Sequence, residues 1–192
     1  MSNEDAQAQD RRTAMLDAAL SLFAEQSYRG TTVPQIAEQA QVGIGTVYRH
    51  FGDKEGLVNA LYQRQFAEME CQYQQVDHTL PFRQRFSSIF FAFSAWIQVR
   101  PQVVKFLEWH DHSAYLTEES WACKRKFIDH SQAFIREGQA QGLVKSLPPM
   151  LLLALIWGMQ LELFRAQMLG LLELTEDDLA AAEQCAWEAI RA

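Results

Sequence analysis

Residues 31–54 read TTVPQIAEQAQVGIGTVYRHFGDK, and this stretch contains the start and stop signals of two short helices. Thr32 and Gln35 have the spacing of a capping box, in which side chains and backbone N–H groups bond reciprocally at a helix start. Gln41–Gly43 interrupts the apolar pattern, and a second helix is expected over Ile44–Phe51. The stretch therefore predicts a helix, a turn of about three residues and another helix.

A longer helix is expected before this pair, beginning at Arg11. The apolar residues between Leu16 and Phe23 recur at the i, i+3, i+4, i+7 spacing of one helix face. Three helices of this kind share a small core, and such a unit places the last of them in the major groove of DNA. Residues 1–10 are polar, and we expect them to form a flexible arm.

The remainder of the chain also predicts helices, because no run alternates apolar and polar residues as a half-buried strand would. The expected helices, delimited by Pro and Gly breaks and by a Thr cap, are 82–99, 101–110, 117–138 or 117–142, 149–171 and 175–192. We therefore expect an all-α protein with a helix-turn-helix domain over residues 11–56. A larger helical bundle is expected over residues 57–192.

The composition excludes several classes of protein. The 192 residues are 48% hydrophobic, which is enough apolar surface to fold. The longest apolar run, Met150–Met159, is well short of the about 20 residues of a membrane span, so no membrane association is expected. The acidic N-terminus is unlike a secretory signal, and three scattered cysteines suit a reduced, cytoplasmic protein. The net charge of −7 argues against a nucleic-acid protein, although residues 28–54 hold three cationic side chains against two acidic ones.

The pattern GTTVxxIAxxAxVGxGTVYxxFxDK over residues 30–54 closely resembles the N-terminal DNA-binding domain of the tetracycline-repressor (TetR) family of bacterial transcriptional regulators. The resemblance covers residues 11–61, and many positions agree at fixed spacing without gaps. The order of the domains is also that of the family, a short DNA-binding head followed by a divergent helical body. The chain departs from the family pattern in the turn, where Gln41 replaces the usual Gly and Gly43 a frequent Ser.

A helix that reads DNA needs small residues where it presses into the groove and hydrogen-bond donors where it meets phosphates. Gly45 suggests such a steric requirement, because glycine inside a helix costs about 1 kcal/mol. The resemblance implies that Thr46, Tyr48 and Lys54 contact the DNA. The expected DNA-binding residues are Thr32, Gly43, Gly45, Thr46, Tyr48, Arg49, His50 and Lys54.

The resemblance also implies that the helical body forms a homodimer. Two helices near the C-terminus carry apolar faces, and two such helices from each subunit would pack as a four-helix interface. The expected dimer residues are Leu153, Leu161, Phe164, Met168, Ala186 and Ile190. The alternative is that these faces form the core of a single subunit. Two recognition helices in a dimer would read half-sites about one helical turn apart, so a palindromic double-stranded operator is expected.

The resemblance further implies that the helical body binds a small-molecule effector. Many aromatic residues there fall at helical spacing, and each belongs either to the core or to a cavity for an apolar or cationic ligand. The expected ligand-binding residues are Phe90, Phe93, Trp96, Phe106, Trp109, Trp121, Phe127 and Trp157. Glu108 and Glu162 are candidate partners of a cation.

The sequence offers little support for catalysis or metal binding. His110 and His112 are two residues apart and would point to different sides of a helix, so we expect a polar loop and no metal site. A nucleophile elbow, a P-loop and a complete GxGxxG are missing, and no cofactor or enzymatic activity is expected. We predict a ligand-responsive transcriptional regulator, a repressor released from its operator by a small, largely apolar effector. The alternatives are a helical enzyme and an adaptor that does not bind operator DNA.

Overall fold

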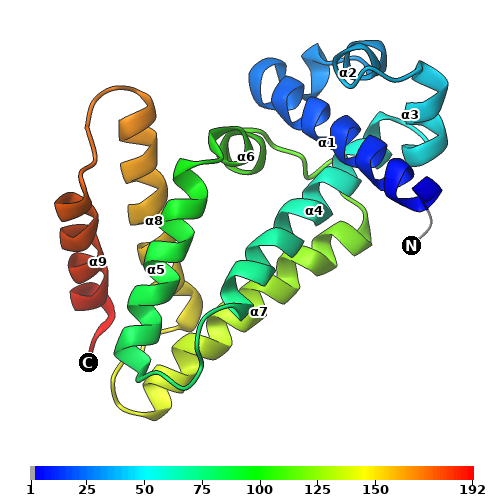
Figure 1. Ribbon diagram of the computed structural model, residues 1–192. Coiled ribbons are helices and arrows are strands. Elements are labelled where there is room, and N and C mark those ends of the chain that lie inside the picture. Colours follow the sequence, from blue (N-terminus) through cyan, green and yellow to red (C-terminus); the bar gives the residue numbers. More distant parts are fainter. Residues whose placement is uncertain (1–2) are drawn as a thin grey trace. The chain divides into compact units, whose positions relative to one another are not determined.

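The computed structural model describes residues 3–192, with side chains described from Ala6 onward (Figure 1). The elements are α1 (Asn3–Gly30), α2 (Val33–Gln39), α3 (Ile44–Phe51), α4 (Lys54–Gln74), α5 (Phe82–Gln98), α6 (Pro101–Val104), the π-helical turn η1 (Lys105–Trp109), α7 (Glu118–Ala140), α8 (Pro149–Met168) and α9 (Glu176–Ile190). Within residues 3–192, the only β-type pairing is an isolated bridge between Val144 and Arg191. The predicted all-α fold class is confirmed.

The chain folds into two compact units, whose boundary differs from the expected division at residue 57. The first unit comprises the chain up to Glu68 together with Arg100–Lys124, and the second comprises Met69–Val99 and Arg125–Ala192. The segment from Arg100 returns to the first unit because α6 and η1 pack on α1. The helices α4 and α7 each contribute residues to both units.

The first helix includes most of the segment that we expected to be a flexible arm. α1 begins at Asn3, so residues 3–10 are helical and the expectation is corrected for them. Two alanines, two glutamines and one glutamate, five of these eight residues, are good helix formers. Arg11 also donates to Gln7 one turn earlier at 3.5 Å. Met1 and Ser2, the rest of the predicted arm, lie outside the described residues.

The core of the first unit is built by the apolar faces that the sequence predicted for its helices. Leu16 and Phe23 of α1, Ile36 of α2 and Val47 of α3 are all buried. Phe106 of η1 completes this core, and its ring lies parallel to that of Phe23 with centroids 6.1 Å apart. The three-helix head therefore includes a fourth, non-local contribution from η1.

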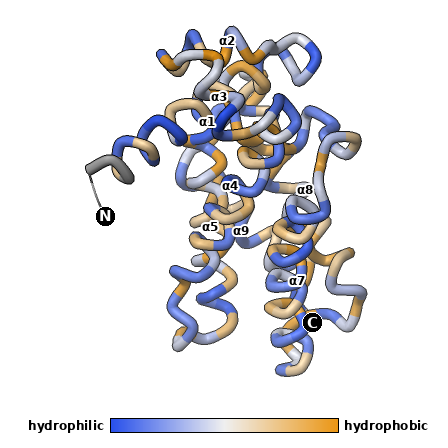
Figure 2. Tube along the Cα trace, turned by 90° about the vertical axis from the view of Figure 1, so that its right-hand side faces the viewer, coloured by the Kyte–Doolittle hydropathy of each residue, from blue (hydrophilic) through white to orange (hydrophobic). Residues whose placement is uncertain are grey.

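The second unit has an aromatic core that runs along α5, α7, α8 and α9. Phe82 and Phe134 stack with ring centroids 4.4 Å apart. Two charged residues of α5 join it to neighbouring helices: Arg85 pairs with Glu137 of α7, and Arg83 donates to Glu183 of α9 at 2.8 Å. Hydrophobic positions recur along the helices and do not gather in one segment (Figure 2).

Gly56 in the first turn of α4 allows the end of α3 to pass close to α4. A Cβ atom at this position would collide with the backbone carbonyl oxygen of Phe51. The side chain of Asp53 accepts a hydrogen bond from the Gly56 amide at 2.7 Å and caps the same turn. Because Gly56 has no side chain, the C-terminal end of α3 can lie against the first turn of α4.

We predict that Gly56→Ala destabilises the protein by about 1–3 kcal/mol, because the backbone of Phe51 must shift to admit the methyl group. Urea unfolding followed by circular dichroism measures this loss. Gly45→Ala in α3 is the matched control, since a Cβ there meets nothing within 4 Å and alanine favours the helix. Equal stability of Gly56→Ala and the natural protein would contradict the prediction.

Candidate DNA-binding surface and ligand cavity

The capping box predicted at the start of α2 is present. The Gln35 side chain accepts a hydrogen bond from the Thr32 amide at 2.8 Å, and the Thr32 side chain accepts one from the Gln35 amide. Pro34 lies in the first turn, where a helix needs no amide donor. Thr32 is exposed at the N-terminal end of α2, and its hydroxyl group also donates to Gln35 Oε1 at 2.8 Å.

The turn between α2 and α3 contains a strained residue. Gln41 has φ 54°, in the left-handed region that favours glycine. The turn is closed by hydrogen bonds from the Gln41 amide to Glu38 O at 3.0 Å and from the Val42 amide to Ala37 O at 2.9 Å. This is the position where the sequence departs from the family's glycine, and the chain adopts the glycine-like conformation nevertheless.

The outward face of α3 carries most of the residues expected to bind DNA. Gly43 is the N-cap, Gly45 has open space around it, and Tyr48 and Arg49 are exposed. The opposite face holds Val47 in the core. Residues Thr46 and His50 are half-buried at the edges of the outward face. The structure therefore brings these predicted residues together on one exposed helix.

Lys54 has a structural contact that sequence reasoning missed. Its ammonium group donates to the Thr31 carbonyl oxygen at 2.8 Å and lies 4.0 Å from the centroid of the Tyr28 ring. Partial burial lowers the pKa of Lys54. Because an ammonium group has three donors, the bond to Thr31 leaves two for a phosphate. Lys54 thus ties the start of α4 to the α1–α2 turn and still has donors for DNA.

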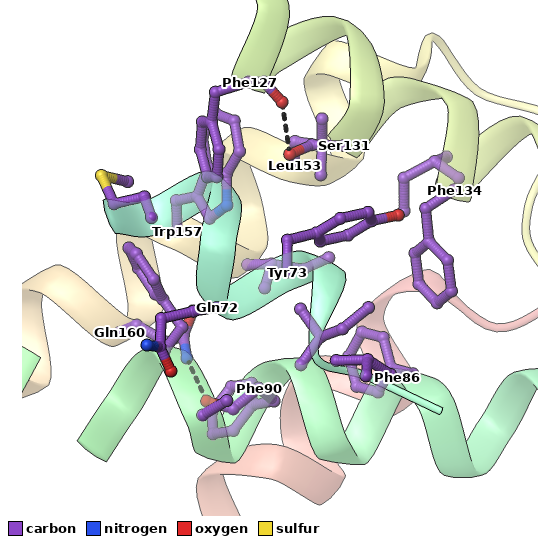
Figure 3. Close-up of a pocket in the computed structure, with 17 residues that line it drawn as sticks. Gln72, Tyr73, Phe86, Phe90, Phe127, Ser131, Phe134, Leu153, Trp157 and Gln160 are labelled. Carbon is purple, nitrogen blue, oxygen red and sulfur yellow. Dashed lines mark hydrogen bonds between the residues drawn. The ribbon is translucent and has the colours of Figure 1, made fainter. Parts of the chain in front are cut away.

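The second unit encloses a cavity of about 70 Å³ between residues of α4, the turn after it, α5, α7 and α8 (Figure 3). This is several times the roughly 10–15 Å³ that one water needs. Its walls are mostly apolar and aromatic, and none of the lining residues is charged. The lining residues are Met69, Gln72, Tyr73, Val76, Phe86, Ile89, Phe90, Ala92, Phe93, Phe127, Ser131, Phe134, Ile135, Leu153, Ile156, Trp157 and Gln160.

Half of the predicted ligand-binding residues line this cavity. They are Phe90, Phe93, Phe127 and Trp157. The rings of Phe127 and Trp157 are stacked with centroids 5.9 Å apart (Figure 3). The sequence did not point to the lining residues of α4, of which Tyr73 has the largest side chain. Burial raises the pKa of Tyr73 to about 12, so its hydroxyl group is neutral near pH 7.

The other predicted ligand-binding residues lie elsewhere, and the prediction is corrected for them. Trp96 is buried beside Phe93 but does not line the cavity. Phe106, Trp109 and Trp121 belong to the first unit. Helical spacing marks an aromatic residue as inward-facing, but it does not say which unit the residue enters. Of the carboxylates considered for a cation, Glu108 is in the first unit and Glu162 is exposed beside Arg165.

Most residues of the predicted dimer set are buried within the second unit itself. Leu153, Phe164, Ala186 and Ile190 are buried, and Leu161 and Met168 are half-buried. The exposed apolar side chains of α8 are instead Met150, Leu151, Ala154 and Leu155. The sequence could not separate the two faces because α8 is apolar on nearly every side. A dimer that uses α8 must therefore use this outer face.

His112, one of the two histidines considered for a metal, is held by the protein itself. Its Nε2 lies 2.7 Å from the carbonyl oxygen of Phe106, and its ring packs on the Phe106 ring. Burial lowers the pKa of His112. Among the described residues, no group of three or more His, Cys, Asp or Glu side chains is arranged to hold a metal ion.

A helix-turn-helix head with an exposed third helix, followed by a larger helical unit that encloses a cavity, defines a DNA-binding transcriptional regulator. Residues 15–61 match the family profile described as bacterial regulatory proteins of the tetR family. Residues 62–192 match the profile described as the tetracyclin repressor-like C-terminal domain. The chain belongs to the TetR family.

Known relatives and solved structures agree with this assignment. The chain is 25% identical over 143 residues to the uncharacterized HTH-type transcriptional regulator YhgD of Bacillus subtilis, covering 73% of this chain and 75% of that one. It is 29% identical over 140 residues to the HTH-type transcriptional repressor KstR2 of Mycobacterium tuberculosis, covering 69% and 70%. A TetR family regulator from Marinobacter aquaeolei has the same fold, with a TM-score of 0.89, 22% identity and coverage of 97% and 98%. FadR of Bacillus subtilis, solved with stearoyl-CoA, has a TM-score of 0.70 at 20% identity, with coverage of 92% and 95%.

We predict that Gln41→Gly stabilises the protein by about 1 kcal/mol, because glycine adopts a positive φ without the steric cost that other residues carry. Urea unfolding measures the gain, which is partly offset by the greater freedom of glycine in the unfolded chain. Gln39→Gly, at the end of α2, is the matched control and is expected to destabilise. A loss of stability in Gln41→Gly as large as in the control would contradict the prediction.

Proposed function

We propose that the protein is a repressor that binds a palindromic operator as a homodimer and leaves it when a small, largely apolar effector enters the cavity. The observation that carries this proposal is the course of α4. This helix begins at Lys54, shortly after α3 in the chain, and Met69, Gln72 and Tyr73 near its end line the cavity. A ligand that favours one arrangement of these residues shifts the population of DNA-binding conformations, to the extent that its affinities for the two states differ.

The relatives support the repressor and effector parts of this proposal. KstR2 is described as a repressor, and the FadR structure contains stearoyl-CoA. The described cysteines, Cys71, Cys123 and Cys185, are all free thiols, which favours a cytoplasmic location. The family is one of transcriptional regulators, and we assign this chain no catalytic role.

The exposed face of α3 supplies the proposed DNA contacts. Gly43 and Gly45 let the start of the helix approach the groove closely, and the hydroxyl groups of Thr46 and Tyr48 donate to phosphates or bases. Arg49 is exposed on the same helix, and His50 lies at its edge. Thr32 and Lys54 lie at the starts of α2 and α4. Their proposed contacts are with DNA phosphates, which the N-terminus of a helix favours.

We predict that Arg49→Ala weakens binding to the operator at least about tenfold and reduces the magnitude of the slope of log K against log salt by about 2, because each subunit of the dimer loses one phosphate contact. Fluorescence polarisation with DNA from upstream of the protein's own gene, or with a site selected from random DNA, measures both quantities. Arg136→Ala is the matched control, because Arg136 is exposed in the second unit and, among the residues that the structure describes, bonds only Gln132 on its own helix.

The adaptor alternative makes the opposite prediction for the same titration. If the protein is an adaptor, selection from random DNA yields no preferred site, and no specific DNA binding that depends on salt is observed. Unchanged affinity and salt slope in Arg49→Ala would remove this residue from the proposed interface. A helical enzyme is separated by the same selection, since it needs no operator.

The exposed apolar face of α8 supports a second copy of the chain as its partner. α8 is long and apolar enough to cross a membrane, and only 28% of its most apolar window is buried. Leu151 and Leu155 are 47% and 45% exposed, one turn apart. Glu162 and Arg165 continue the helix toward its end with a charged pair, which suits a water-exposed interface better than lipid. When this face packs symmetrically against the same face of a second copy, the apolar side chains of both copies are buried, and Glu162 and Arg165 stay in water.

We predict that Leu155→Glu converts the protein to a monomer and weakens operator binding at least about tenfold, because one head reads only one half-site. Size-exclusion chromatography with light scattering measures the mass. Val99→Glu is the control, since Val99 is 75% exposed in the same unit but away from α8 in the chain. A dimeric Leu155→Glu protein would show that another surface joins the copies.

A further inference from the structure

We infer that the effector is an uncharged molecule, mainly apolar, with one hydroxyl or N–H group that donates to the side-chain oxygen of Gln160. This inference rests on the proposed function and specifies the ligand of its cavity. It narrows the sequence prediction, which left apolar and cationic ligands open. The inference depends on the chemistry of the cavity walls and on the charged residues around them.

The cavity offers no charge to a ligand. None of its lining residues is Asp, Glu, Lys, Arg or His, and the polar ones are Gln72, Tyr73, Ser131 and Gln160. A carboxylate or an ammonium group brought here would lose its water without gaining an opposite charge. Such a transfer is strongly unfavourable, and attraction to an aromatic face compensates only a part of it.

Several charged side chains close in sequence to these walls are paired with one another. Glu70 follows Met69 on α4, and its Oε1 lies 2.5 Å from Nδ1 of His130 on α7. Arg85 pairs with Glu137, and Arg83 donates to Glu183 at 2.8 Å. A charged ligand would have to compete with these existing pairs for a partner.

Gln160 supplies an acceptor in the cavity wall whose orientation is fixed by two hydrogen bonds. Its Nε2 donates one hydrogen to the Phe90 carbonyl at 2.9 Å (Figure 3) and the other to Ser94 Oγ at 3.0 Å. The carbonyl oxygen of Phe90 is only an acceptor, so it defines which end of the amide is nitrogen. Among the described residues, no group donates to Gln160 Oε1. This oxygen belongs to a residue that lines the cavity, and an acceptor to which no described side chain donates favours a ligand that brings a donor.

The other polar groups of the wall do not change this conclusion. Ser131 donates its hydroxyl hydrogen to the Phe127 carbonyl at 2.9 Å, on its own helix. The Tyr73 hydroxyl, whose pKa burial raises to about 12, is neutral at pH 7. The Gln72 amide is neutral as well, so these groups select by hydrogen bonding and shape and not by charge.

The test compares four ligands with the same ring and ethyl group on the full-length protein, at pH 7 by isothermal titration calorimetry. They are 4-ethylphenol, 4-ethylanisole, 4-ethylbenzoate and 4-ethylbenzylammonium. We expect 4-ethylphenol to bind most tightly, and the two ions to bind about tenfold or more weakly because their charges are unpaired. 4-Ethylanisole, which cannot donate, is expected to bind several-fold more weakly than the phenol.

Two variants show whether binding occurs in this cavity. Gln72→Lys places a cation in the wall and is expected to raise the affinity for 4-ethylbenzoate about tenfold relative to 4-ethylphenol. Gln75→Lys is the matched control, because Gln75 is exposed just after α4 and does not line the cavity. The ligand series on the natural protein remains decisive if Gln72→Lys does not fold.

A carboxylate or ammonium ligand that binds as tightly as 4-ethylphenol would overturn the inference, and so would a series without any saturable binding. Operator binding without ligand is measured separately by fluorescence polarisation. If the protein binds an operator but prefers the charged ligands, the proposed function is supported and the inferred class of ligand is wrong. If no operator is found while 4-ethylphenol is preferred, the ligand class stands and the proposed function fails.

Discussion

The close approach of α3 and α4 at Gly56 is the constraint on which the DNA-binding head depends. The carbonyl oxygen of Phe51 occupies the space in which any other residue would carry its Cβ. Asp53 caps α4 in the same turn, and Lys54 reaches back to the Thr31 carbonyl at 2.8 Å. One short turn therefore ties the recognition helix to α4 and to the start of α2. The contacts of Asp53, Lys54 and Gly56 therefore fix the orientation of α3, although none of these residues belongs to its exposed face.

In the second unit, ion pairs between side chains connect neighbouring helices. Arg83 and Arg85 of α5 bind Glu183 of α9 and Glu137 of α7, so the ion pairs hold the helices whose aromatic residues form the core. These four charged side chains do not line the cavity, whose wall consists of uncharged residues.

The sequence predicted features that depend on neighbouring residues and missed those that depend on distant ones. The capping box of Thr32 and the breaks around α3 are local signals, and the head follows them. Phe106 has the same helical spacing as Phe90, but it enters the core of the other unit because its segment returns to α1. α8 is apolar on nearly all sides, so no stripe in the sequence distinguished the buried Leu153 from the exposed Leu155. The cavity wall of α4 was missed because its lining residues are mixed with polar ones.

The residues that line the cavity also explain why a small ligand can influence the head. Phe86, Phe90 and Leu153 belong both to the cavity wall and to the packed core. A packed core does not deform continuously, so a ligand that alters it favours a second arrangement and not a slight expansion of the first. α4 contributes residues to this wall and to the first unit, so in the proposed function it is the element that would couple ligand and operator. If the effector reduces the affinity for operator DNA, linkage requires that operator DNA reduces the affinity for the effector by the same factor.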